Sequence, residues 1–132
     1  TCPCSADSTV DRVAYMLATI DQNTSDLSKA RFVSTLKRVE MLLDIPEQTD
    51  RYAAIGDKCV AAKDMLKEEG IAVSLLAYLE MLNKIGSRMD IYDYKPPIAD
   101  ILAMYNVARI NGFKHDEAVN GIIEILATIL EQ

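Results

Sequence analysis

Three cysteines are the residues of this sequence whose chemistry is easiest to place. Cys2 and Cys4 lie in a short polar opening segment, and Cys59 lies inside a stretch with helical periodicity. In an oxidising compartment Cys2 or Cys4 could pair with Cys59, and Cys4–Cys59 is the candidate disulfide; a bridge closing ~55 residues would stabilise the fold by a few kcal/mol. The alternative is that Cys59 is a small buried apolar residue, as free cysteines often are. Because Cys-x-Cys without further Cys or His nearby does not supply four ligands, the sequence indicates no metal site.

The other reactive side chains do not form a catalytic motif. His115 is the single histidine, and no nucleophile or carboxylate motif accompanies it, so we interpret it as a polar residue at the start of a helix. Glu40 and Glu80 lie among apolar residues, where each is either a buried acid or a surface acid. The sequence contains no phosphate-binding glycine loop, zinc-protease motif or nucleophile elbow. We therefore expect no enzyme and no cofactor.

Composition narrows the class of partner. The chain has 132 residues, of which 50% are hydrophobic and 26% charged, and its formal net charge is −6. This length and composition suit one folded domain with a real core. A net negative charge argues against nucleic acid, because phosphate binding depends on an excess of Lys and Arg. We expect no membrane span, since no apolar run approaches the ~20 residues that one needs.

The periodicity of apolar residues predicts the helices that carry these candidate residues. It predicts helices over about 9–21, 26–43, 47 or 50–69, 71–88, 97 or 98–111, and 115 or 116 to the last residue. Ser8 is the expected N-cap of the first helix. The short connections predict an all-α fold, a compact bundle of about six antiparallel helices. We expect residues 1–7 to form a flexible N-terminal tail and 8–132 a single helical domain.

The longest expected connection, 89–97, is the candidate partner-binding site. It places Tyr92 and Tyr94 beside Asp90 and Asp93 in an acidic loop that ends in two prolines. Tyrosine is common at interaction hot spots because it offers a large rigid face and a polar tip. The alternative is that the tyrosines fold back and cap the bundle.

The last helix has more apolar surface than one packing neighbour requires, since Ile125 and Ala118 widen its stripe. This helix either lies centrally or pairs with a copy of itself, which would give a homodimer. Alternatively, the surplus surface could hold an apolar ligand between the last three helices. The expected lining of that site is Met81, Leu82, Met104 and Ile122.

These patterns favour binding over catalysis. The expected function is a small acidic helical protein-binding module, of the kind found among extracytoplasmic inhibitors and immunity-type proteins. The alternative is a carrier of an apolar small ligand or lipid. The polar opening segment would suit the first residues after a cleaved export signal, so we expect a soluble periplasmic or secreted protein.

Overall fold

Six α-helices account for most of the chain that the structure describes, which is residues 6–132 of a computed structural model. The helices are α1 (Ala6–Ile20), α2 (Asp26–Leu42), α3 (Arg51–Glu68), α4 (Leu75–Asp90), α5 (Ile98–Ile110) and α6 (His115–Leu130). Within residues 6–132 there is no β-strand, only an isolated bridge between Asp44 and Pro97. The predicted all-α bundle of six helices is confirmed.

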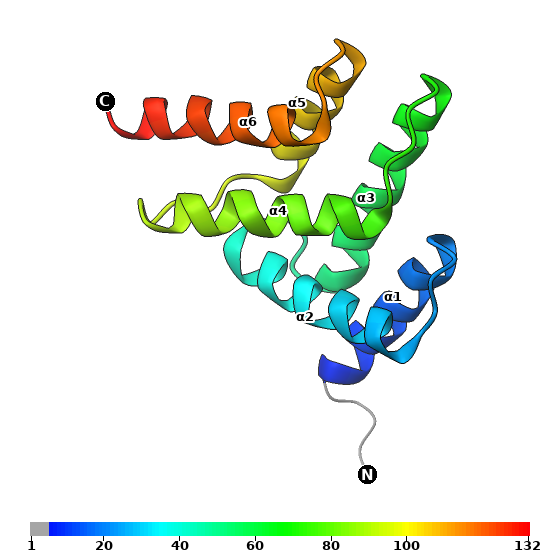
Figure 1. Cartoon of the computed structure of the whole chain (residues 1–132). Coiled ribbons are helices and arrows are strands. Elements are labelled where there is room, and N and C mark those ends of the chain that lie inside the picture. The colour runs from blue at the N-terminus through cyan, green and yellow to red at the C-terminus, as the bar shows by residue number, and fades with distance from the viewer. Residues whose placement is uncertain (1–5) are drawn as a thin grey trace.

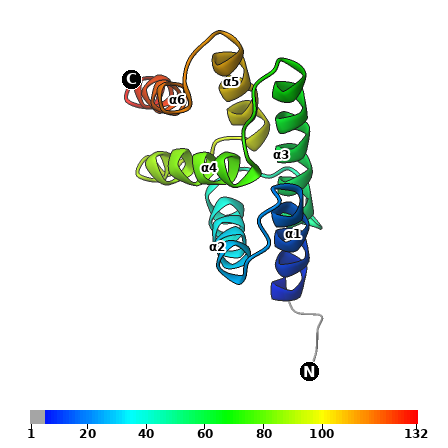
Figure 2. The ribbon, with the colours of Figure 1, turned by 45° about the vertical axis from the view of Figure 1, so that its right-hand side comes forward.

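The helices form two layers. In Figures 1 and 2, α1, α3 and α5 lie in one layer and α2, α4 and α6 in the other. Each helix packs on the helix two places further along the chain, so that α1 contacts α3, α2 contacts α4, α3 contacts α5, and α4 contacts α6. The pair α1–α2 therefore forms one end of the bundle and the pair α5–α6 the other. No helix in the described part of the chain has the length and apolar character to cross a membrane.

Helix α4 lies centrally, since it contacts α1, α2, α3 and α6. Its core contacts are so close that Gly86 faces α2 directly: a Cβ atom on Gly86 would lie 2.8 Å from Cβ of Leu42 and 3.3 Å from Cδ2 of Leu43. Gly56 similarly lies where α3 meets α1: a Cβ atom added at Gly56 would lie 3.3 Å from Cγ1 of Val13. These two glycines let neighbouring helices approach each other.

The largest differences from the predicted boundaries lie at the starts of α1 and α4. Helix α1 begins at Ala6, so Ser8 lies inside the helix and does not precede it. Helix α4 begins at Leu75 and not at residue 71, because Ser74 is its N-cap: the Ser74 Oγ accepts a hydrogen bond from the Ala77 N–H at 3.1 Å. Gly70, with φ +79°, ends α3 and turns the chain into the extended connection before Ser74.

A carboxylate from α1's C-terminal turn completes the start of α4. Oδ1 of Asp21 accepts the Leu75 N–H at 2.8 Å, and Oδ2 accepts the Leu76 N–H at 3.0 Å. Both are backbone donors that an isolated helix leaves without an intrahelical partner. Asp21 thus connects the first helix to the central one by two hydrogen bonds that also favour the helix dipole.

A buried polar group joins α3, α4 and α5. The Tyr78 hydroxyl donates to Oδ1 of Asn106 at 2.7 Å, and Nδ2 of Asn106 donates to the Ala62 carbonyl at 3.0 Å. Burial raises the pKa of Tyr78 well above its usual range, so the phenol stays neutral and keeps its donor. Because each polar atom in this hydrogen-bonded network has a partner, the network fixes α5 against α3 and α4.

Candidate binding groove

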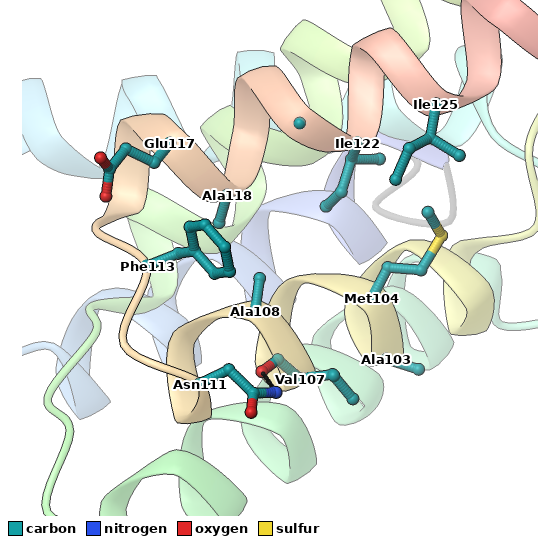
Figure 3. A pocket seen from close by; sticks show the side chains of 11 residues that line it. Ala103, Met104, Val107, Ala108, Asn111, Phe113, Glu117, Ala118, Ile122 and Ile125 are labelled. Carbon is teal, nitrogen blue, oxygen red and sulfur yellow. Dashed lines mark hydrogen bonds between the residues drawn. The ribbon is translucent and has the colours of Figure 1, made fainter.

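An apolar groove runs between α5 and α6 at the end of the bundle. Its volume is about 510 Å³, which lies within the ~300–1,000 Å³ of typical ligand sites. The lining comes from both helices and their connecting turn: Ala103, Met104, Val107, Ala108, Asn111, Phe113, Glu117, Ala118, Gly121, Ile122 and Ile125. Figure 3 shows Phe113 at the turn end of the groove, and Met104 and Ile125 towards its other end.

The rims of this groove are large apolar side chains in contact with solvent. Val107 is 59% exposed, Phe113 53% and Ile125 53%. Single exposed apolar residues are common on protein surfaces, whereas a contiguous exposed apolar patch is a candidate place for another molecule to bind. The groove is such a patch, because its lining is continuous across two helices.

Gly121 lies in the groove, at a position where a side chain would enter open space. It sits in the interior of α6, where glycine is less favourable than alanine by about 0.5–1 kcal/mol. A Cβ atom at this position would have no heavy-atom neighbour within 4 Å, and the backbone is not left-handed there. Neither packing nor backbone geometry requires a glycine, in contrast to Gly56 and Gly86. Its effect is to leave the α6 side of the groove open, down to the backbone.

The turn between α5 and α6 fixes the shape of the groove. Gly112 adopts φ +96°, and the Phe113 N–H donates to the Ala108 carbonyl at 3.0 Å. At the start of α6 the Lys114 N–H donates to Oε1 of Glu117 at 2.9 Å, which is half of a capping box. These bonds fix the backbone of the turn that carries Phe113, whose side chain lines the groove.

A second set of polar side chains, none of which lines the groove, ties α5 to the start of α6. Nη1 of Arg109 donates to the Tyr105 hydroxyl at 2.8 Å, and that hydroxyl lies 2.8 Å from Nδ1 of His115. Since Tyr105 accepts from Arg109, its own proton is available to Nδ1 of His115. Burial raises the pKa of Tyr105, and the hydrogen bond from Arg109 opposes part of that rise. His115 is thus a structural residue that orients α6.

A second apolar hollow, between α3 and α5, adjoins the groove. It has a volume of about 310 Å³ and shares Ala103 and Val107 with the groove. Its exposed apolar residues include Met65 on α3 and Ile110 at the end of α5. The apolar surface therefore continues over α5 from α6 to α3.

The structure places the predicted loop residues in two different environments. Asp90 and Asp93 are exposed, whereas Tyr92 and Tyr94 are half-buried and pack against the core. The Tyr92 hydroxyl donates to Oε2 of Glu131 at 2.5 Å, and this bond raises the pKa of Tyr92 above its usual value. The tyrosines thus follow the folding-back alternative, while partner binding by this loop stays a prediction.

The loop is also anchored to the end of α2. The Asp44 N–H donates to the Pro96 carbonyl at 3.0 Å, and the Ile98 N–H donates to the Asp44 carbonyl at 3.2 Å. Asp93 has φ +53°, which turns the chain between the two tyrosines. The two hydrogen bonds to Asp44 fix the C-terminal end of the loop, which suits a structural role.

The four residues predicted to line a ligand site separate into two pairs. Met104 and Ile122 line the α5–α6 groove, but Met81 and Leu82 are buried in the core and do not reach it. The expected site between three helices is thus a surface groove between two of them. The broad apolar stripe of the last helix indicated Ala118 and Ile125 as surplus apolar surface. No sequence signal indicated that Gly121 lines the groove.

The remaining candidates of the sequence have structural environments. Cys59 lies in the core with no disulfide partner among residues 6–132, and burial raises its pKa from 9.0 to about 12. Its expected partner Cys4 lies outside the described residues, so the disulfide stays a prediction. Glu80 is an exposed acid with Oε2 2.5 Å from Nη2 of Arg31, and Glu40 is a half-buried acid with Oε2 2.8 Å from Nε of Arg51.

Two further observations bear on the class of site. Within residues 6–132, no three His, Cys, Asp or Glu side chains gather in a geometry that could hold a metal ion. The groove itself is lined by apolar side chains and carries a single carboxylate, Glu117.

Comparison of the chain with protein-family models, with curated proteins and with solved structures finds no match.

Proposed function

We propose that this protein is a protein-binding module that receives an amphipathic segment of a partner protein in the groove between α5 and α6. The observation that carries the proposal is Gly121, a helix-interior glycine that the fold does not need and that keeps the groove open. Glycine is the residue that allows another molecule to approach a backbone closely. An inhibitor or immunity-type protein, as expected from the sequence, is one form of this function.

The shape of the groove favours a peptide segment over a small molecule. Sites for small molecules enclose about 70–90% of the ligand surface. Here the rim residues Val107, Phe113 and Ile125 are more than half exposed, so the groove covers one side of its occupant. An amphipathic helix suits that geometry, because it buries one apolar stripe and leaves its polar face in water.

A carrier of an apolar ligand is the second candidate function. Two of its expected lining residues, Met104 and Ile122, do line the groove, and methionine adapts to ligands of irregular shape. The carrier function requires that a fatty acid or detergent-like molecule bind with the groove closed around it. Native mass spectrometry of the purified protein would then show a retained small molecule.

Selection from a displayed library of helical peptides tests the proposed function. The library would hold 16-residue helices with varied side chains at all positions of one face, and selected peptides would then be measured by fluorescence anisotropy. We expect selected peptides to carry apolar residues at spacings of three and four, which form one stripe along a helix.

Two substitutions on α6 form a matched pair for this test. Gly121→Leu fills the groove and is expected to weaken the selected peptides at least tenfold. Asn120→Leu adds the same side chain at an exposed neighbouring position that does not line the groove, and is expected to change affinity less than twofold. Equal affinities for the two variants, with circular dichroism showing both folded, would rule out the groove as the binding site.

A further inference from the structure

Acidic side chains accompany the groove along α6. Glu117 lines the groove, and Glu124 is exposed beside Ile125, which also lines it. The two glutamates are seven residues apart, which is about two helical turns or ~10.5 Å along the axis, so they lie on the same side of the helix. Glu124 has no hydrogen-bond or ion-pair partner among residues 6–132. A carboxylate row thus follows one rim of an apolar surface.

Basic side chains do not balance this row. Helix α6 contains no Lys or Arg, and its first turn adds a further carboxylate, Asp116. The Arg109 guanidinium is half-buried and donates to the Tyr105 hydroxyl, so its hydrogen bonding serves the fold. Lys114, in the turn, is the one exposed base between the two helices. The α6 rim is therefore a negative edge, and the chain as a whole carries a formal net charge of −6.

We infer that the partner segment is a basic amphipathic helix, with an apolar stripe that enters the groove and Lys or Arg residues along the flank that faces α6. This inference rests on the proposed function and adds the chemistry of the partner. Packed helices lie about 8–10 Å apart, a distance at which flanking side chains of opposite charge meet as they do in coiled coils. Complementary charge also speeds encounter and selects the orientation of the partner.

The same charges disfavour two other occupants of the groove. An anionic membrane surface would repel the carboxylates on the α6 rim, since peripheral binding depends on Lys and Arg. A second copy that paired through α6 would bring together two helices without a Lys or Arg between them, and like charges across an interface reduce affinity. Vesicle binding and self-association are therefore outcomes that the experiment must distinguish.

The test uses a library of the same helical peptides with Lys, Gln and Glu equally represented at the flanking positions. We expect enrichment of Lys on one flank, and the affinity advantage of those peptides over their Gln counterparts should fall as sodium chloride rises from 50 to 500 mM. Glu124→Gln should weaken the Lys-flanked peptides about two- to fivefold, the range for an exposed ion pair. Glu68→Gln, an exposed acid at the end of α3, should leave affinity unchanged and serves as the control.

The outcomes separate this inference from the proposed function. Enrichment of apolar stripes with neutral or acidic flanks would overturn the basic partner and leave the protein-binding function standing. Absence of any enriched helix would overturn both. Binding to phosphatidylglycerol vesicles, or a dimer in light scattering that Gly121→Leu abolishes, would replace the basic helix with a membrane or a second copy as occupant.

Discussion

Replacing Gly121 by alanine should stabilise the fold, although the residue lies in the candidate site. Alanine is about 0.5–1 kcal/mol more favourable than glycine inside a helix, because glycine loses more backbone entropy on folding. The new methyl group would meet no atom within 4 Å, so no steric cost opposes this gain. The free energy of unfolding should therefore rise by the full difference in helix propensity.

This gain is large enough to measure by thermal unfolding. An entropy of unfolding of ~2.1 cal/mol/K per residue converts 0.5–1 kcal/mol into a rise in Tm of about 2–4 °C for a chain of this length. Circular dichroism at 222 nm follows the transition directly, because the described fold is helical throughout. Urea unfolding at 25 °C gives the free energy independently of the heat capacity.

Gly86→Ala is the matched control, since it makes the same change in the interior of another helix. There the new Cβ would lie 2.8 Å from Cβ of Leu42, an atom next to the backbone that moves only if α2 moves. Overpacking of this kind costs about 1–3 kcal/mol and outweighs the gain in propensity. The two substitutions should therefore shift Tm in opposite directions.

The outcome for Gly121→Ala also bears on binding. A methyl group in the groove reduces the space for an apolar anchor, so the stabilised variant should bind groove peptides more weakly than the original chain. A fall in Tm would show that the surroundings of Gly121 are closed, and would refute the reasoning from open space. A rise in Tm for Gly86→Ala would equally refute the close approach of α4 and α2.

Three further predictions concern the core. Asp21→Ala removes both acceptors at the start of α4 and should lower the free energy of unfolding in urea by about 1–3 kcal/mol, with a smaller loss for Asp21→Asn, which keeps one oxygen. Tyr78→Phe deprives Asn106 of its buried donor and should cost about 1–3 kcal/mol, whereas Tyr94→Phe, at a half-buried tyrosine outside this network, should stay within about 0.5 kcal/mol of the original chain; equal losses would contradict the buried network. With Cys2 and Cys4 replaced by serine, Cys59 should react with a thiol reagent at pH 8 only as fast as the protein unfolds, and rapid labelling of the folded protein would contradict its burial. The raised pKa of Cys59 should also make the free energy of unfolding decline as the pH rises above about 9, because the thiol ionises first in the unfolded chain.

The helices were predictable because their signals are local. Apolar residues at spacings of three and four identified all six elements, and the turn glycines Gly70 and Gly112 marked the ends of α3 and α5, where both adopt positive φ. The surplus stripe of the last helix also predicted a real feature, since Ala118 and Ile125 both line the groove. A stripe wider than one neighbour needs is thus a sequence signal of apolar surface that the fold does not cover.

Features that depend on distant partners were not predictable in the same way. The start of α4 was placed too early, because Ile71 and Val73 continue the apolar pattern, and the Asp21 carboxylate that completes the true N-terminus comes from another helix. The Tyr92 hydroxyl bonds to Glu131, and the end of the loop bonds to Asp44; both partners are distant from the loop in sequence. A loop sequence rich in tyrosine is therefore compatible with recognition and with capping alike.

The three helix-interior glycines show most clearly why a site of this kind needs a structure. Gly56, Gly86 and Gly121 each weaken a helix by a similar amount, and nothing in their sequence context separates them. At Gly56 and Gly86 a neighbouring helix occupies the space that a side chain would fill, so tertiary packing offsets the weakened helix. At Gly121 no heavy atom of a neighbouring helix lies within 4 Å of the position that a Cβ would take, so no neighbouring helix occupies that space. A partner that packed against the α6 backbone at Gly121 would supply contacts that offset the cost of the glycine. For this reason the groove at Gly121, and not the tyrosine loop, is the better candidate for the binding site.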